Sequence, residues 1–401
     1  MVLALVAGLL TGCDHETEIA PPRASTGSGG DHSEVAQVAL DRLVRAVRTG
    51  DRSAAVALAA PGSRDVLGWV ADNAASLRVD ELSLRYVDDG KPLTASEQAD
   101  LGKGAWRGTV QLGYRYAGLD TSPARLETSV VFQPGSGAAR IASFGSADER
   151  SPLWLVDRLS VVRTAHSLVA VAGSSVGRYA VLVARALRQV RLVLPRWTGP
   201  LVVEVPRTRA QLDAALQAQP GQYDNIAAVT TTADGSLVPG SPVRVFVNAD
   251  VFDRLKARGA QVVMSHEATH VATKATFASM PTWLLEGFAD YVALAHAGVP
   301  LKVAAGQILP QIRKDGLPSG LPTSQDLDPT ATGLGATYEE AWLTCRYLAQ
   351  EYGEAGLIRF YDKVSAGASA QASFRSELGT TQRAFVAGWR QDLARLAGVA
   401  R

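Results

Sequence analysis

The spacing of hydrophobic residues predicts helices first and strands afterwards in the amino-terminal part of the chain. Residues 34–50 repeat apolar side chains at helical intervals, and two shorter helical stretches follow to about residue 75. Alternating runs typical of strands come next, at 77–87, 106–118, 125–133 and 139–146. Trp106, Tyr114 and Tyr116 alternate along one of these runs, and we expect them to lie in a core. Helices followed by an antiparallel sheet predict an α+β accessory domain over residues 34–157.

A second pattern begins at residue 158 and mixes strands with helices. It predicts strands at 166–173, 200–205, 225–231 and 243–249, with helices at 176–194 and 208–218. Residues 312–336 are rich in Gly, Pro, Asp and Thr and predict a long loop, which we expect to rim a cleft. Helical spacing resumes at residue 337. The predicted second domain, residues 158–401, therefore has a small mixed sheet and a helical carboxy-terminal half, and the whole chain is predicted to be α+β.

The first residues predict export and a lipid anchor. The apolar run 1–13 is too short to span a bilayer and ends in small residues, as a signal segment does. Leu10-Thr11-Gly12-Cys13 resembles a bacterial lipobox, which implies lipidation of Cys13 and an extracytoplasmic, membrane-anchored protein. A plain secretory signal and a short buried strand are the alternatives. The polar segment 14–33 predicts a flexible linker.

The chemistry is concentrated in residues 261–293, which predict two short helices joined by a turn. The first helix carries the sequence H-E-x-x-H as His266, Glu267 and His270. Positions four apart share a face of a helix, so both imidazoles are able to reach one metal ion. Ser279 is expected to cap the second helix, with Pro281 in its first turn.

The second helix carries two carboxylates four residues apart, Glu286 and Asp290, among apolar neighbours. Zinc in a hydrolytic site takes three protein ligands and keeps an open position, and Glu286 completes a set of three with the two histidines. Asp290 is then placed to accept a hydrogen bond from a ligand histidine. The alternative is that Asp290 is itself the third ligand.

These motifs resemble those of the gluzincin metallopeptidases, in particular the bacterial peptidase MA-like group related to the thermolysin-type and aminopeptidase enzymes. The resemblance implies a zincin-like fold, zinc bound by His266, His270 and Glu286, and Glu267 as the general base. It also implies that Tyr338 stabilises the oxyanion, although the residues after Tyr338 match only in part, and the alternative is that Tyr338 is a packing residue. The interval from His270 to Glu286 is shorter than in the aminopeptidases, and no G-x-M-E-N sequence occurs, which favours an endopeptidase.

The same resemblance implies that the strand Val243–Asn248 forms the edge of the cleft and pairs with extended peptide substrate. Residues 34–157 weakly resemble the nuclear transport factor-like cone fold. We therefore expect a peptide or protein substrate, a zinc cofactor and a monomer.

Composition adds limits to this hypothesis. A net charge of +1 gives no indication of nucleic-acid binding, and a hydrophobic fraction of 47% is ample for packed cores. Cys345, the cysteine other than Cys13, lies in an apolar helical pattern and is expected to be a buried small hydrophobe. Two other functions remain open: a catalytically silent zinc module that binds peptide, and a non-enzymatic envelope lipoprotein whose accessory domain is the working part.

Overall fold

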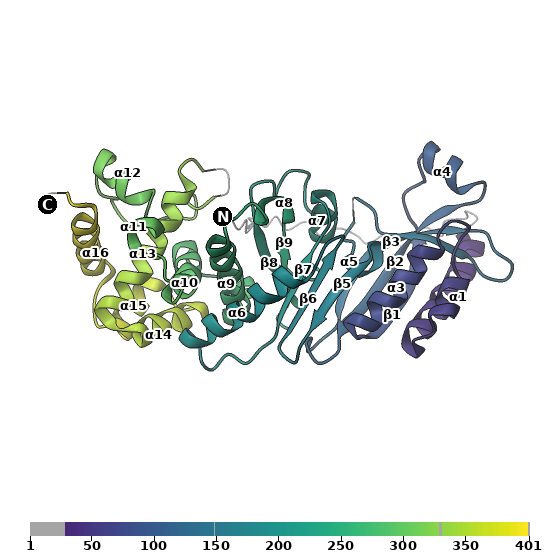
Figure 1. Cartoon of the computed structure of the whole chain (residues 1–401), viewed down its shortest axis with the longest axis horizontal. Helices are drawn as coiled ribbons and strands as arrows, with labels where there is room; N and C mark the ends of the chain where they lie inside the picture. The colour runs from purple at the N-terminus through teal and green to yellow at the C-terminus, as the bar shows by residue number, and fades with distance from the viewer. Residues whose placement is uncertain (1–28, 148, 329–330, 400–401) are drawn as a thin grey trace, which may run out of the picture.

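The amino-terminal third of the chain forms an antiparallel sheet covered by helices. In this computed structural model, which describes residues 29–147, 149–328 and 331–399, the sheet has the strand order β1-β2-β3-β4. Its strands are β1 (Val79–Asp89), β2 (Trp106–Tyr116), β3 (Ala124–Gln133) and β4 (Arg140–Phe144). Its helices are α1 (Gly29–Thr49), α2 (Arg52–Ala57), α3 (Arg64–Leu77) and α4 (Ala95–Leu101). Helices α1 and α3 lie along the sheet (Figure 1) and share its core, which contains Trp106, Tyr114 and Tyr116 as expected.

Helix α1 begins earlier than the sequence pattern indicated. Residues 29–33, expected to belong to the linker, form the start of this helix. The ring of His32 stacks on Trp106 with 4.3 Å between centroids, and its Nδ1 lies 3.2 Å from a carboxylate oxygen of Asp89. His32 thus contacts residues far away in the sequence, and the polar composition of its segment does not predict these contacts.

A second, mixed sheet occupies the middle of the molecule, with the strand order β5-β6-β7-β9-β8. Its strands are β5 (Leu159–Arg163), β6 (Ser167–Ala172), β7 (Leu201–Val205), β8 (Ala228–Thr232) and β9 (Val243–Val247). The helices among them are α5 (Leu153–Val156), α6 (Gly177–Val193), α7 (Arg209–Leu216) and α8 (Ala249–Phe252). The β6–β7 and β7–β9 pairs are parallel, whereas β5–β6 and β8–β9 are antiparallel.

The position of β9 corrects one prediction. The strand Val243–Asn248 was expected at the edge of the sheet, but β9 lies between β7 and β8, so that prediction is wrong. After β8 the chain turns back and inserts β9 beside β7, with Ala233 N–H donating to the carbonyl of Pro242 where the hairpin closes. The edge strand on this side of the sheet is therefore β8, and β5 forms the opposite edge.

Both faces of the second sheet are covered. Along β6, Val169 and Val171 belong to the core that contains α6, whereas Leu168 and Ala170 belong to the core of the amino-terminal unit. A strand buried on both faces has a continuous apolar sequence, as β6 has. The amino-terminal unit is thus packed on one face of the second sheet. The boundary between residues 157 and 158 stays a prediction.

Charged side chains also join the two sheets. Arg244 of β9 donates two hydrogen bonds, of 2.7 and 2.6 Å, to the carboxylate of Asp120, which follows β2. The hydroxyl of Tyr116 donates to Glu204 of β7 at 3.0 Å, and the Arg244 guanidinium lies over the Tyr116 ring. All four side chains are buried, so this contact belongs to the interior of the molecule.

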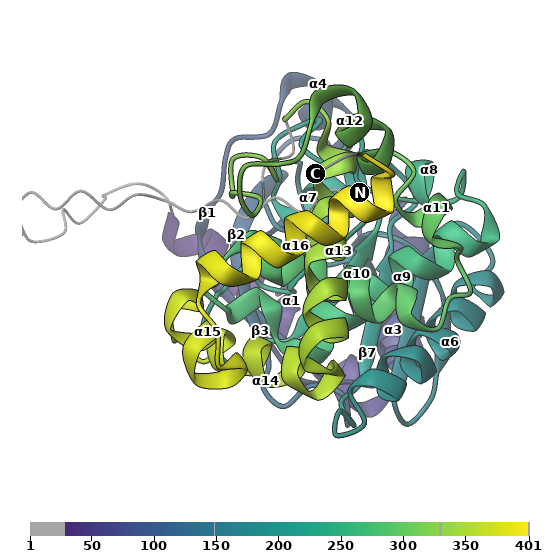
Figure 2. The same cartoon turned by 90° about the vertical axis from the view of Figure 1, so that its left-hand side faces the viewer.

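The carboxy-terminal half is helical. It contains α9 (Ala257–Thr273), the 3-10 turn η1 (Ala275–Phe277), α10 (Thr282–Ala295), α11 (Leu301–Ala304), α12 (Ile308–Asp315), α13 (Leu334–Tyr352), α14 (Glu354–Ser365), α15 (Ala370–Leu378) and α16 (Gln382–Ala397). Figure 2 shows α16 crossing the end of the molecule in front of α13. The sheets lie in the first part of the chain and the helices in the second, which confirms the predicted α+β class.

Two local predictions in this half are wrong. The loop predicted at 312–336 is shorter, because α12 continues to Asp315 and α13 already begins at Leu334. Helix α10 begins at Thr282 with Pro281 at its N-cap position and no side-chain cap, so Ser279 does not cap it. A capping side chain has to stand at the N-cap itself, and Ser279 lies two residues before that position.

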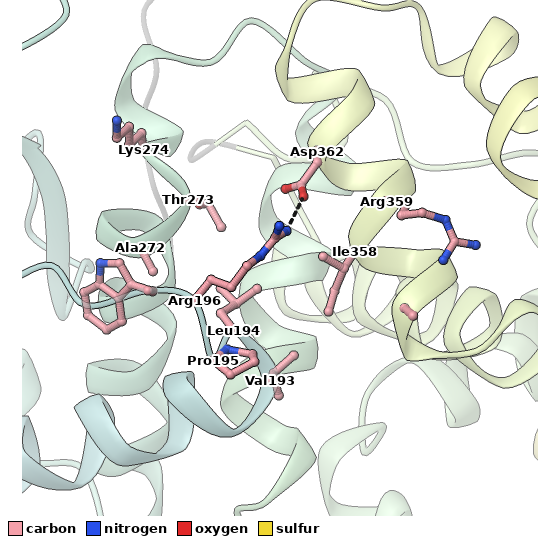
Figure 3. A pocket seen from close by; sticks show the side chains of 12 residues that line it. Val193, Leu194, Pro195, Arg196, Ala272, Thr273, Lys274, Ile358, Arg359 and Asp362 are labelled. Atoms are coloured by element: carbon pink, nitrogen blue, oxygen red, sulfur yellow. Dashed lines mark ion pairs between the residues drawn. The ribbon is translucent and has the colours of Figure 1, made fainter.

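A cavity of about 530 Å³ lies where the carboxyl ends of α6 and α9 meet the side of α14 (Figure 3). Its lining includes Leu194 and Ile358, and an ion pair of 3.8 Å between Arg196 and Asp362 crosses it. Thr273, at the end of α9, is also part of the lining. The cavity therefore adjoins α9 at its carboxyl end.

The signal segment and Cys13 lie outside the described residues, so lipidation stays a prediction. Among the helices in the described ranges, none is long and apolar enough to cross a membrane.

Candidate metal centre

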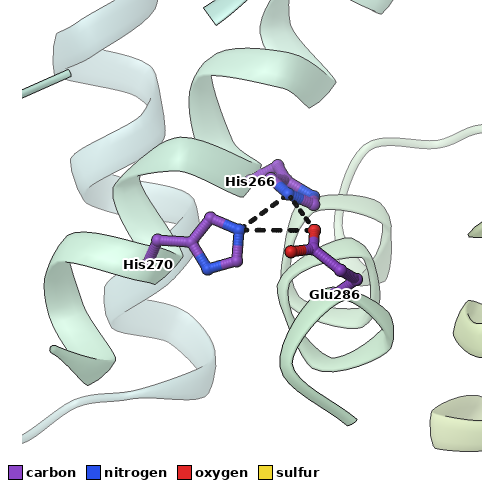
Figure 4. Close-up of side chains that lie close together, drawn as sticks. All are labelled: His266, His270 and Glu286. Carbon is purple, nitrogen blue, oxygen red and sulfur yellow. Dashed lines mark hydrogen bonds and ion pairs between the residues drawn. The ribbon is translucent and has the colours of Figure 1, made fainter. Parts of the chain in front are cut away.

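Two packed helices bring the predicted ligands together. Helix α9 presents His266 and His270 on one face, and α10 packs against α9 and contributes Glu286. One ligand atom from each of the three residues lies within 4.8 Å of the others, and all three side chains are buried. In Figure 4 the two rings and the carboxylate point toward a common centre.

The distances among these atoms fit a bound cation. The two Nε2 atoms of His266 and His270 are 2.9 Å apart, and Glu286 Oε2 lies 3.2 Å from the first and 3.5 Å from the second. Glu286 Oε2 and His270 Nδ1 are buried without a hydrogen-bond partner. One proton can bridge only two of the three converging atoms, whereas a divalent cation satisfies all three. Two imidazole nitrogens and a carboxylate oxygen are a typical donor set for zinc.

Asp290 supports one ligand from behind. Its Oδ1 lies 2.7 Å from His266 Nδ1, on the side of the ring away from the other ligands. Such a contact fixes the ring and directs its other nitrogen toward the metal. Burial opposes a charge on His266, but the Asp290 carboxylate, with Glu286, raises its pKa well above the ordinary value. The structure therefore places Asp290 beside His266 and outside the group of three, and its role behind a metal ligand stays a prediction.

The electrostatics keep Glu286 ionised. Burial alone would raise the pKa of its carboxyl group, but the neighbouring imidazoles of His270 and His266 lower it to about 2. An ionised carboxylate is the form that binds metal.

Gly287 explains how α10 reaches this position. A Cβ atom there would collide with the carbonyl oxygen of Ala341 on α13 and would lie 3.0 Å from Cys345 Sγ. The two helix backbones therefore approach closely at the residue after Glu286, and only glycine permits this approach. Cys345 is fully buried, as the sequence predicted, and burial raises the pKa of its thiol well above the ordinary value.

Glu267 is held by a residue that sequence analysis missed. Its side chain is 1% exposed, and its Oε2 accepts a hydrogen bond of 2.7 Å from the hydroxyl of Thr230. Thr230 lies on the edge strand β8, in a run of small and β-branched residues whose pattern reveals a strand but not its neighbour.

Tyr338 lies in the second turn of α13 rather than at its start. Its side chain is buried in the large core that α10 and α13 share. Its predicted role at the oxyanion stays a prediction.

Compared with protein families and with curated proteins, the sequence matches none. Among solved structures, the fold is similar to a mutant of a two-domain M1 zinc metallopeptidase bound to L-arginine, with 15% sequence identity and a TM-score of 0.34. The alignment covers 75% of this chain and 62% of that one, so this chain spans less than two thirds of the neighbour's length. So distant a likeness carries no argument about activity, and the assignment of a metal centre rests on its side chains.

Proposed function

We propose that the protein is a zinc metallopeptidase that hydrolyses peptide bonds, as the gluzincin-like motif implies. The observation that supports this most is the convergence of His266, His270 and Glu286 within 4.8 Å of one another, with Glu267 next to His266 in the same buried site. Three protein ligands of this kind, together with a free carboxylate, are the parts that a hydrolytic zinc site needs.

A zinc ion bound by these three residues supplies Lewis acidity, which polarises the scissile carbonyl and acidifies water. Glu267 removes a proton from the attacking water as the water oxygen bonds to the carbonyl carbon. It then passes that proton to the amine nitrogen, and the carbon–nitrogen bond breaks. Asp290 keeps His266 in the orientation that binds the metal, and Tyr338 is proposed to donate to the oxyanion.

The position of β8 at an edge of the sheet supports a peptide as the substrate. Ladder pairing joins Ala227 to Asn248 and Ala233 to Pro242, so the backbone groups of alternate residues face β9. The residues between them, including Thr230, direct N–H and C=O away from the sheet. Extended peptides pair with sheet edges of this kind. Because Ala228, Thr230 and Thr232 are buried, such pairing beside Glu267 requires this edge to be uncovered first.

Burial of the site supports a second function, a silent zinc module that binds peptide. His266, Glu267, His270 and Glu286 are each 1% exposed, whereas a catalytic zinc has to admit substrate to an open position. The presence of Glu267 argues against this function, because zinc binding alone does not require a carboxylate beside His266.

Cleavage of a peptide library separates the two functions. Purified protein is assayed as prepared, after dialysis against a chelator, and after zinc is restored. The peptidase proposal expects cleavage that the chelator abolishes and zinc restores. A protein that holds one zinc per chain and cleaves nothing across the library is the silent module.

We also propose that the protein is extracytoplasmic and anchored through a lipid on Cys13. In a bacterial host, the wild-type protein should partition into detergent and Cys13→Ala should release it. Unchanged fractionation of the variant would remove the lipid anchor from the account.

A further inference from the structure

Thr230 joins the edge strand to the carboxylate of Glu267. Its Oγ1 lies 2.7 Å from Glu267 Oε2 and 3.2 Å from the Glu267 carbonyl oxygen. A hydroxyl has one proton to donate, and the shorter distance with the charged acceptor makes the carboxylate the stronger partner. Both residues are buried, which strengthens a hydrogen bond of this kind.

We propose that Thr230 is a positioning residue for the general base, an inference that rests on the proposed peptidase function. By donating to Oε2, Thr230 fixes the rotation of the carboxylate and leaves Oε1 to exchange protons with the attacking water. It acts through Glu267, and it neither binds the metal nor reacts with the substrate.

The same hydrogen bond keeps Glu267 from becoming a ligand. Glu267 follows His266 directly, and its side chain has several rotatable bonds. Without a fixed partner, its carboxylate is able to turn toward the cation and to occupy the position that the substrate needs. Anchoring one oxygen to a strand, outside the helix pair that carries the ligands, prevents that rotation.

The fold gives Thr230 this position through the register of β8. Thr230 stands opposite Val245 of β9, and Thr231 stands opposite Arg244. Directly opposed residues share a face of the sheet, and successive residues alternate between faces. Val245 packs in the core that contains α9, whereas Arg244 contacts the amino-terminal unit. Thr230 therefore faces α9, and Thr231 faces the other way.

This register provides a matched set of variants. Thr230→Ala and Thr230→Ser differ by the hydroxyl alone, and Thr230→Val keeps the shape of threonine without the hydroxyl. Thr231→Val makes the same change one residue further along β8 but on the opposite face. Each variant is measured as the full, zinc-loaded chain for zinc content, zinc affinity, melting temperature, kcat and KM on one peptide substrate.

We expect Thr230→Val and Thr230→Ala to lower kcat by about 10–100-fold, the usual cost of losing a group that orients a site. KM should change by less than about threefold, because the backbone edge of β8 is unaltered, and zinc affinity should not fall. Thr230→Ser should retain most of the wild-type kcat, and Thr231→Val should behave as wild type.

Three results would count against the proposal. If wild type cleaves and Thr230→Ala has the same kcat as Thr230→Ser, Thr230 has no positioning role although the peptidase function stands. If Thr230→Ala raises KM and leaves kcat unchanged, Thr230 serves substrate binding instead. If wild-type protein loaded with zinc cleaves nothing, the peptidase function fails and the role of Thr230 fails with it.

Discussion

Two clusters of charged side chains are buried in this molecule, and they differ in how their polar atoms are satisfied. Where the two sheets meet, Arg244 donates two hydrogen bonds to Asp120, and Tyr116 donates one to Glu204. Burial opposes the charge on Arg244, but Asp120 raises its pKa, while burial raises the pKa of Glu204 and favours the neutral form. The charge on Arg244 is paired with Asp120 in this cluster, although Arg244 Nε, 3.6 Å from Glu204 Oε1, makes no hydrogen bond.

Between α9 and α10 the arrangement is different. The facing nitrogens of His266 and His270, together with Glu286 Oε2, converge on one point, and Glu286 Oε2 has no hydrogen-bond partner. The carboxylate of Asp120 pairs with Arg244 within the first cluster, whereas the second cluster presents three converging ligand atoms that fit a metal ion. Burial of charge alone therefore does not indicate a metal, whereas convergence of two imidazole nitrogens and a carboxylate oxygen fits one.

Removing a ligand should have the largest effect. His270→Ala, or His266→Ala, leaves two ligands and should reduce bound zinc from one ion per chain to none after dialysis. His166→Ala is the matched control, because His166 is exposed in the turn before β6. Full zinc retention by His270→Ala would place the metal elsewhere.

Removing Arg244 tests the other cluster. Arg244→Met leaves the buried Asp120 carboxylate without its cationic partner, with the Tyr116 N–H still donating to it. This change should lower the free energy of unfolding by about 3–5 kcal/mol, measured by urea titration. The folded variant should still bind zinc. Asp120→Asn combined with Arg244→Met should recover part of the loss. If Arg244→Met alone were as stable as wild type, the contact between Arg244 and Asp120 would contribute little to the free energy of unfolding.

The next largest effect should appear in the pH dependence of the free energy of unfolding of metal-free protein. The pKa of Glu286 is lowered from 4.5 to about 2, so its carboxylate stabilises the fold above pH 4.5, and this contribution is lost as the pH falls toward 2. Its size is on the order of 3 kcal/mol. The pKa of His266 is raised, so its contribution is present below its ordinary value of 6.5 and is lost at high pH. Glu286→Gln should flatten the acid limb of a plot of stability against pH, and an unchanged limb would contradict this assignment.

The smallest effect is expected from Asp290, which contacts a ligand without being one of the three. Asp290→Asn should weaken zinc binding by about 10–100-fold without abolishing it, as measured by competition with a chelating dye. Complete loss in Asp290→Asn, with retention in Glu286→Gln, would make Asp290 the third ligand.

The sequence predicted those parts of the site that depend on local geometry. The spacing of His266 and His270, and of Glu286 and Asp290, places each pair on one face of a helix whatever surrounds it. The two ligand helices and the α+β class followed from the same periodicities. These features depend only on residues within a few helical turns of one another, so the sequence is enough to predict them.

The features that the sequence did not reveal depend on strand order and helix approach. Placing β9 inside the sheet requires knowledge of which strand pairs with β7, and the hydrogen bond from Thr230 follows from that order. The need for Gly287 arises from Ala341 on another helix. Asp120 and Arg244 are far apart in sequence, and neither residue has a pattern that predicts its partner.

The most direct test of the central claim is the zinc content and activity of Glu267→Gln beside wild type. Glutamine keeps the size of the side chain and its ability to accept from Thr230, but it has no basic carboxylate. We expect one zinc per chain in both proteins, with hydrolysis of an unfolded protein substrate lowered by at least about 10²–10⁴-fold in the variant. Glu267→Asp should also be poor, because its shorter side chain draws the carboxylate away from the water. Equal cleavage by Glu267→Gln and wild type would contradict the mechanism.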